Sequence, residues 1–178
     1  MVKRLATKTL YRGRVAKLML DTFRKESGLV YKRETIHHPP SVVILPLINK
    51  NELLLISQFR HAINKEILEI PAGTSEPGES MLACAKRELA EETGYTASKW
   101  TRLIDFYPAP GISTERMTLF VAEKLRPLSK RIAMDVDESI VTAVTPIRKA
   151  VQMVQKGKII DAKSIIGILW GLNLIRWK

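Results

Sequence analysis

The sequence predicts an α/β fold of the α+β kind, a mixed α/β sandwich preceded by a small N-terminal antiparallel β module. Segments rich in β-branched and aromatic residues dominate the first third of the chain, whereas helical periodicity appears later. The apolar run 41–48, "SVVILPLI", follows Pro39 and Pro40 and is typical of a buried central strand. We therefore expect a β module over residues 1–40 and the main domain over residues 41–178.

The N-terminal module is expected to contain three strands. The segments "KTLYRG", "RVAKLMLDTFR" and "LVYKRETIHH" have strand composition, and Arg12-Gly13 and Ser27-Gly28 separate them. The first twenty residues hold six Lys or Arg and no acid, which is also compatible with a transit peptide. A strand pair with exposed basic faces is the favoured interpretation.

The main domain is expected to open with a hairpin in which residues 49–51 join strands 41–48 and 52–60. Residues 66–73, "EILEIPAG", predict a short strand that ends in a loop. A helix follows over residues 80–93. Leu82, Ala85 and Leu89 recur on one face of it at helical spacing, and Gly94 suits its C-terminal cap.

The remainder of the chain predicts three strands and then two helices. The strands are "TRLIDFY", "MTLFVAEKL" and "SIVTAV", and the loop "PAPGISTER" separates the first two. The helices lie near 146–156 and 162–176. Gly157 separates them, and Asp161 suits the N-cap of the second.

Composition narrows the class of protein. A single cysteine, Cys84, excludes a disulfide framework and a Cys-based zinc site, and its place in a helix predicts a buried thiol. No apolar run reaches the ~18–20 residues of a membrane span, and no secretory signal is visible, so we expect a cytoplasmic protein without a membrane partner.

The charge balance favours an anionic partner. There are 29 Lys and Arg against 18 Asp and Glu, a formal net charge of +11. A nucleotide, a nucleic acid or a membrane surface would fit, and a solvated basic face is the alternative. The basic residues are scattered rather than clustered, which disfavours nucleic acid.

Against this basic background, three glutamates gather on the helix 80–93. Glu88 stands three and four residues before Glu91 and Glu92, where like charges destabilise a helix by about 0.2–0.5 kcal/mol per pair. The preceding loop "EIPAGTSEPGE" is rich in Gly and Pro, which lets backbone carbonyls approach a ligand. Carboxylates and carbonyls are ligands of Mg²⁺ or Mn²⁺, so the pattern predicts a metal site that binds a polyphosphate.

Residues 73–95 resemble the Nudix box, G-x5-E-x7-R-E-U-x-E-E-x-G-U with U aliphatic, of the Nudix hydrolases. Eight positions over these 23 residues match, and Tyr95 at the last U position departs. The matched positions are Gly73, Glu79, Arg87, Glu88, Leu89, Glu91, Glu92 and Gly94. The resemblance implies a Nudix-type α/β/α sandwich with a mixed sheet.

The resemblance also implies roles for these residues. Glu88 and Glu92, with Glu91 close by and the carbonyl of Ala72, would hold Mg²⁺ or Mn²⁺, at two or three ions per site. Arg87 would orient the glutamates through charge-assisted pairs. Gly73, Glu79 and Gly94 would be structural, and a metal-related role for Glu79 is the alternative.

Three further segments resemble the ADP-ribose and ADP-sugar pyrophosphatase branch of the family. In "QFRHAINKEILEIPAG" (58–73), Arg60 and Glu69 would contact substrate. In the loop 108–116, Pro110 lies fifteen residues after Tyr95, an offset associated with ADP-sugar specificity, and Gly111 adjoins it. Residues 157–172 resemble the branch's C-terminal helix.

The implied reaction is hydrolysis of the pyrophosphate of ADP-ribose, or a related ADP-sugar, to AMP and ribose 5-phosphate by a metal-activated water. The general base is expected on an acidic loop. Glu138 is the preferred base, Asp137 is the second candidate and Glu115 is the third. Glu115 would alternatively bind a metal ion or a ribose hydroxyl.

The resemblance also implies a homodimer, in which the N-terminal module of each subunit contributes to its partner's site. The competing interpretations are a Nudix hydrolase of GDP-mannose, of a diadenosine polyphosphate or of an RNA 5′ end, and a module that binds ADP-ribose without cleaving it. The intact Glu88, Glu91 and Glu92 argue against the last of these.

Overall fold

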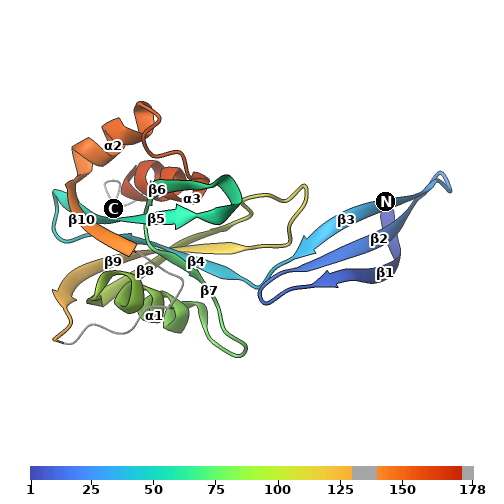
Figure 1. Cartoon of the computed structure of the whole chain (residues 1–178), viewed down its shortest axis with the longest axis horizontal. Helices are drawn as coiled ribbons and strands as arrows, with labels where there is room; N and C mark the ends of the chain where they lie inside the picture. Colours follow the sequence, from blue (N-terminus) through green and yellow to red (C-terminus); the bar gives the residue numbers. More distant parts are fainter. Residues whose placement is uncertain (130–139, 174–178) are drawn as a thin grey trace. The chain divides into compact units, whose positions relative to one another are not determined.

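The computed structural model describes residues 1–129 and 140–173 and divides into two compact units (Figure 1). The first unit is Met1–Pro40 with Phe106–Arg116, and the second is Ser41–Asp105 with Met117–Lys178. The loop after Phe106, in which the sequence placed substrate residues, therefore belongs to the same unit as the N-terminal strands.

The first unit is a three-stranded antiparallel sheet in the order β1-β2-β3. Its strands are β1 (Val2–Arg12), β2 (Lys17–Lys25) and β3 (Val30–His37). The loop 106–116 attaches to the end of β3, because the Ile36 N–H donates to the carbonyl of Ile112 and the Thr114 N–H donates to that of Ile36.

Side-chain contacts across the strands add to the backbone pairing of this sheet, in which β1 is exposed along its whole length. Asp21 on β2 is buried and accepts a hydrogen bond from Thr7 on β1. This hydrogen bond is the main cause that lowers the pKa of the Asp21 carboxyl. Phe23 stacks on Tyr31 of β3 with ring centroids 5.7 Å apart. A polar and aromatic set of contacts thus takes the place of an apolar core.

The second unit contains a four-stranded sheet in the order β7-β4-β9-β8 and a three-stranded sheet in the order β10-β5-β6. The strands of the first are β4 (Ser41–Pro46), β7 (Ala72–Thr74), β8 (Tyr95–Phe106) and β9 (Met117–Pro127). Those of the second are β5 (Glu52–Arg60), β6 (Lys65–Glu69) and β10 (Ile140–Pro146). Strand β4 pairs parallel with β9 and antiparallel with β7, so the sheet is mixed as predicted.

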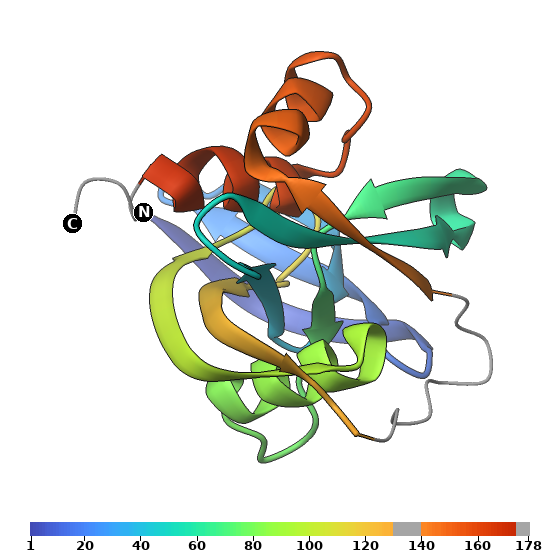
Figure 2. The same cartoon turned by 90° about the vertical axis from the view of Figure 1, so that its left-hand side faces the viewer.

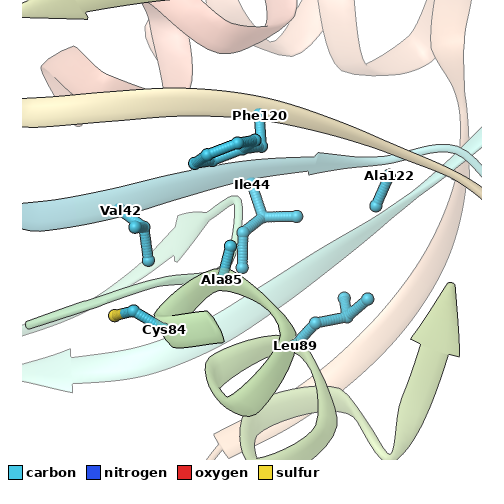
Figure 3. Close-up of a cluster of buried hydrophobic side chains, with 7 residues drawn as sticks. All are labelled: Val42, Ile44, Cys84, Ala85, Leu89, Phe120 and Ala122. Carbon is cyan, nitrogen blue, oxygen red and sulfur yellow. The ribbon is translucent and has the colours of Figure 1, made fainter. Parts of the chain in front are cut away.

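Helices cover both faces of the four-stranded sheet (Figure 2). Helix α1 (Met81–Thr93) packs on one face in a buried cluster that includes Val42, Ile44, Cys84, Leu89 and Phe120 (Figure 3). The other face meets the C-terminal helices α3 (Ala162–Ile165) and η2 (Ile166–Gly171), while α2 (Ile147–Gln155) follows β10. This arrangement confirms the expected sandwich and explains why all six residues of β4 are buried.

Two predicted strand assignments were wrong. Residues 41–48 and 52–60 do not form a two-stranded hairpin: the bridge Leu47–Leu53 closes the turn, and then β4 and β5 enter different sheets. The strand predicted over 66–73 is interrupted at Ile70 and Pro71, and its two parts, β6 and β7, also enter different sheets. Strand pairing depends on distant partners, which the local sequence pattern does not contain.

Two predictions about the helices also need correction. Leu82 is exposed, because the buried face of α1 is centred on Ala85, Leu89 and Glu92, and Leu82 lies in the first turn at its edge. The last helix is not α-helical throughout: it is α-helical over Ala162–Ile165, π-helical over Ile166–Gly171, and α-helical again at residues 172–173, where the described part ends. Across the described residues, none of the helices has the length and apolar character needed to cross a bilayer.

Candidate active site

Helix α1 has well-defined ends. The Ser80 side chain accepts a hydrogen bond from the Ala83 N–H at 3.2 Å, as an N-cap does. At the other end, Gly94 adopts φ 73° and its N–H donates to the carbonyl of Ala90 at 2.9 Å. These caps fix the helical register, which places Glu88, Glu91 and Glu92 in the last two turns.

Arg87 is the centre of the polar contacts beside this helix. Its guanidinium donates to both carboxylate oxygens of Glu79 at 3.1 Å and to the carbonyl of Thr74 at 3.1 Å. It also pairs with Glu88 at 2.8 Å and with Glu91 at 2.9 Å. One cation thus lies against three carboxylates and offsets the repulsion that the sequence spacing creates.

The pKa values of this group reflect the same contacts. The hydrogen bonds with Glu79 are the main cause that raises the pKa of Arg87 above its ordinary value. The same pair lowers the pKa of the Glu79 carboxyl. Arg87 therefore stays charged, and Glu79 stays ionised to lower pH than an isolated glutamate.

Gly73 lies directly against Glu88. A Cβ built on Gly73 would be 1.9 Å from the Glu88 carboxylate carbon and 2.1 and 2.3 Å from its two oxygens. A side chain at position 73 would have to displace the Glu88 carboxylate, so glycine allows the backbone of β7 to approach a carboxylate of α1.

Glu92 is buried at 3% exposure and faces the same strand, β7. Its Oε2 accepts a hydrogen bond from the Ala72 N–H at 3.0 Å. Two consecutive residues of β7, Ala72 and Gly73, therefore contact Glu92 and Glu88 respectively. The structure thus brings Ala72 next to the glutamates.

The donor set here fits a hard divalent cation, because it consists of carboxylate oxygens beside the backbone of β7. The side chains are held by Arg87 and by the Ala72 N–H. Among residues 1–129 and 140–173, no three acidic, His or Cys side chains converge on one point as in a formed metal site. Coordination would therefore require the glutamates to turn toward the ion.

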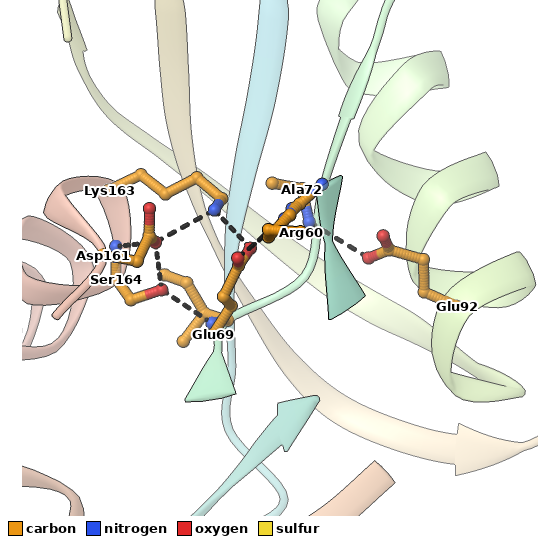
Figure 4. A network of polar contacts seen from close by, with 8 residues as sticks. Arg60, Glu69, Ala72, Glu92, Asp161, Lys163 and Ser164 are labelled. Atoms are coloured by element: carbon orange, nitrogen blue, oxygen red, sulfur yellow. Dashed lines mark hydrogen bonds and ion pairs between the residues drawn. The ribbon is translucent and has the colours of Figure 1, made fainter. Parts of the chain in front are cut away.

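A second polar network lies on the side of this strand opposite to Glu92 (Figure 4). Arg60 makes a bidentate pair with Glu69, from Nε at 2.7 Å and from Nη2 at 2.6 Å. Glu69 is 1% exposed and also accepts from Lys163. The hydrogen bond with Glu69 is the main cause that raises the pKa of Arg60. The structure thus pairs the two predicted substrate residues with each other.

Sequence reasoning missed Lys163 and Ser164 in this network. Lys163 also pairs with Asp161 at 2.9 Å, and Ser164 accepts from the Ile70 N–H at 2.9 Å. Asp161 is the N-cap of α3, as predicted, and accepts from the Ser164 N–H at 3.0 Å. The pair of Lys163 with Glu69 joins residues 94 positions apart, so it leaves no local signal in the sequence.

Comparison with known proteins identifies the family. The model of the NUDIX domain family matches residues 37–165, which is most of the chain. This chain belongs to the Nudix family. In this chain, the Nudix box over residues 73–95 contains α1 and the segment before it.

Several curated relatives resemble the chain over most of its length. An ADP-ribose pyrophosphatase of Bacillus subtilis is 34% identical over 166 residues, which cover 93% of this chain and 90% of that protein. An ADP-ribose pyrophosphatase of Mycobacterium tuberculosis is 31% identical over 93% of this chain and 80% of its own. A GDP-mannose pyrophosphatase of Citrobacter koseri is 31% identical over 82% of this chain and 81% of its own.

Among solved structures, one titled as an ADP compounds hydrolase superposes with a TM-score of 0.87 and 23% identity. It covers 99% of this chain and 95% of that one. This likeness supports the Nudix fold over the whole length of the chain.

The remaining predicted site residues belong to other segments of the chain. Pro110, Gly111 and Glu115 belong to the first unit. There, the Glu115 carboxylate lies 3.6 Å from His38 Nδ1. Asp137 and Glu138, the preferred candidates for the general base, lie outside the described residues.

Proposed function

We propose that this Nudix protein is a metal-dependent pyrophosphohydrolase that cleaves ADP-ribose, or a related ADP-sugar, into AMP and ribose 5-phosphate. The observation that carries the proposal is the close packing of Ala72 and Gly73, in β7, against Glu92 and Glu88 in a complete box. The ADP-ribose pyrophosphatases among its relatives, at 31–34% identity over most of the chain, support the choice of substrate.

Nudix hydrolases generally use divalent metal ions. In this chain, Glu88, Glu91, Glu92 and the carbonyl of Ala72 would hold Mg²⁺ or Mn²⁺, in two or three ions. Once bound, the ions would supply an activated water and offset the charge on the pyrophosphate. Arg87 would keep the glutamates on one side of α1, because it already pairs with Glu88 and Glu91.

The substrate would be bound by groups outside the box. Arg60 is fully charged and 36% exposed, and Glu69 fixes its plane through two hydrogen bonds. An oriented guanidinium suits a phosphate oxygen pair. Pro110 and Gly111 would shape the sugar side of the site, so Pro110→Ala is expected to broaden specificity.

A carboxylate must accept the proton of the attacking water. Glu138 is the proposed base, Asp137 is the second candidate, and Glu115 is the third. Replacing each in turn by its amide and comparing pH–rate profiles would rank them, because loss of the base removes the acidic limb of the profile.

The first unit supports the proposal of a homodimer. Every residue of β1 is exposed, and Val2, Leu5, Leu10 and Tyr11 on it are apolar or aromatic. Apolar side chains on an exposed strand gain free energy when another surface covers them. We propose a second copy of this chain as that surface.

The proposed cytoplasmic location would be tested by fractionating native cells.

Product analysis tests the proposed activity. The purified protein with Mg²⁺ is expected to release AMP and ribose 5-phosphate from ADP-ribose, and a chelator should abolish the reaction. GDP-mannose, diadenosine tetraphosphate and RNA with a 5′-triphosphate serve as competing substrates. Faster cleavage of GDP-mannose, which the Citrobacter relative makes the second candidate, would overturn the choice of ADP-ribose. Binding of ADP-ribose without cleavage would overturn the enzymatic proposal.

A further inference from the structure

The segment Glu69–Ala72 joins the two sheets of the second unit. Glu69 is the last residue of β6 in the three-stranded sheet, and Ala72 is the first residue of β7 in the four-stranded sheet. Ile70 and Pro71 make the crossing between them. The backbone of this segment leads directly to the glutamates of α1.

The first interaction that fixes this segment is ionic and comes from α3. The Glu69 carboxylate lies between Arg60 and Lys163. Lys163 is 8% exposed and has Asp161 as its second acidic partner at 2.9 Å. A buried carboxylate depends on such partners, because an unpaired charge cannot regain its hydration there.

The second interaction that fixes this segment is a hydrogen bond to the backbone of Ile70. Ser164 is fully buried, and its Oγ accepts from the Ile70 N–H and donates to Asp161 at 2.6 Å. Packing acts at the same residue, because a Cβ on Gly167 would come within 2.3 Å of the Ile70 side chain. The helix backbone therefore lies against Ile70 with no room between them.

The opposite end of the segment is held by α1 and β4. The Ala72 N–H donates to Glu92 at 3.0 Å, and the carbonyl of Pro71 accepts from the Ile44 N–H at 2.8 Å. Figure 4 shows Lys163, Asp161 and Ser164 on one side of the strand and Glu92 on the other. A continuous series of contacts thus runs from α3 through four residues of backbone to Glu92.

We propose that Asp161, Lys163 and Ser164, here called the α3 anchor, are positioning residues for the metal-binding group. The anchor fixes the segment Glu69–Ala72 so that the Ala72 backbone stays against Glu92. Loss of the Lys163–Glu69 pair or of the Ser164–Ile70 hydrogen bond loosens the Ala72–Glu92 contact, although neither side chain touches Glu92. This inference rests on the proposed function only in assigning Ala72 and Glu92 to metal binding.

The experiment compares two variants with a matched control. Lys163→Met removes the buried cation and keeps much of its apolar stem, and Ser164→Ala removes a single oxygen. Lys149→Met makes the same chemical change at an exposed lysine of α2 and is the control. Two quantities are measured on each protein: the exchange rate of the Ala72 amide in the metal-free state, by NMR, and the affinity for Mn²⁺, by electron paramagnetic resonance.

Both variants are expected to show faster exchange at Ala72 and about 10-fold weaker Mn²⁺ binding, as for other groups that support metal ligands. Lys149→Met should match the wild type. If Ala72 exchange and Mn²⁺ affinity stay at wild-type values while only the melting temperature falls, the anchor is merely structural and the inference is overturned. If Lys163→Met fails to fold, Ser164→Ala decides the matter by the same two measurements. The exchange measurement needs neither metal nor substrate, so failure to cleave ADP-ribose would overturn the proposed function without touching this inference.

Discussion

Strands β4 and β1 are opposite extremes in the solvent exposure of their residues. All six residues of β4 are buried, between α1 on one face of its sheet and the C-terminal helices on the other. All eleven residues of β1 are exposed. The second unit therefore supplies its own core, whereas the first unit leaves a complete strand without cover from the described residues of this chain.

Residues 1–40 and residues 41–178 also differ in their charge. Residues 1–40 hold ten of the 29 Lys and Arg and three of the 18 Asp and Glu. The acids of residues 41–178 include the glutamates of α1. Residues 41–178 thus contain the proposed chemistry, and residues 1–40, which include the exposed strand β1, contain much of the positive charge.

The largest effect is expected from Glu92→Gln, which lies in the second unit. Hydrolysis should fall by at least about 100-fold, since even groups that only support metal ligands cost 10–100-fold when removed. The fold should survive, because the carbonyl oxygen of the amide can still accept from the Ala72 N–H. Turnover and melting temperature are measured together. Retained turnover would show that the metal assignment is wrong.

Gly73→Ala should separate metal binding from folding in the same unit. The new Cβ would displace the Glu88 carboxylate, which is the far end of a flexible side chain, so the melting temperature should change little. Affinity for Mn²⁺ should fall by about 10-fold or more. Gly111→Ala is the control for metal affinity, because no atom lies within 4 Å of the Cβ it would add. Equal Mn²⁺ affinity in both variants would contradict the role of Gly73.

The double change Leu5→Glu/Leu10→Glu tests the dependence of the first unit on another surface. If a second copy covers β1, analytical ultracentrifugation should show a shift from dimer to monomer, because burying two new carboxylates at the interface is costly. Val141→Glu makes a similar change on exposed β10 and should leave the mass unchanged. A wild-type protein that is already monomeric would refute the dimer.

The smallest effect concerns Cys84, which is inside the core of the second unit. Burial raises the pKa of its thiol to about 12. Folding therefore favours the protonated thiol, and its contribution to stability is present below the unfolded pKa of about 8.5 and falls as pH rises above it. Native protein should resist iodoacetamide at pH 8 and react once unfolded. Rapid labelling of the native state would show that this core opens easily.

The local parts of the fold could be predicted from the sequence. The caps and composition around α1 gave a helix over 80–93, and the structure has Met81–Thr93. The uninterrupted apolar run after Pro40 predicted the buried strand β4. Both features depend on neighbouring residues, so the sequence pattern contains the information.

The features that could not be predicted depend on distant partners. The separation of β4 from β5 follows from the pairing of β4 with β9 and of β5 with β10. In the candidate site, the glutamates and Arg87 could be found through their spacing, but Lys163 and Ser164 could not. They act on Glu69 and Ile70, each 94 residues away in the sequence.

The crossing at Ile70 and Pro71 also bears on which changes of chain length this protein can accept. An extra residue between Glu69 and Gly73 would shift the pairing of β6 or β7 by one position and turn its side chains to the opposite face. The turn at residues 26–29 has no such constraint, because it joins two neighbouring strands of one sheet at an exposed end, where an extra residue lengthens the turn. In a library of single-residue insertions, functional variants should therefore be common around residues 26–29 and missing from residues 69–73.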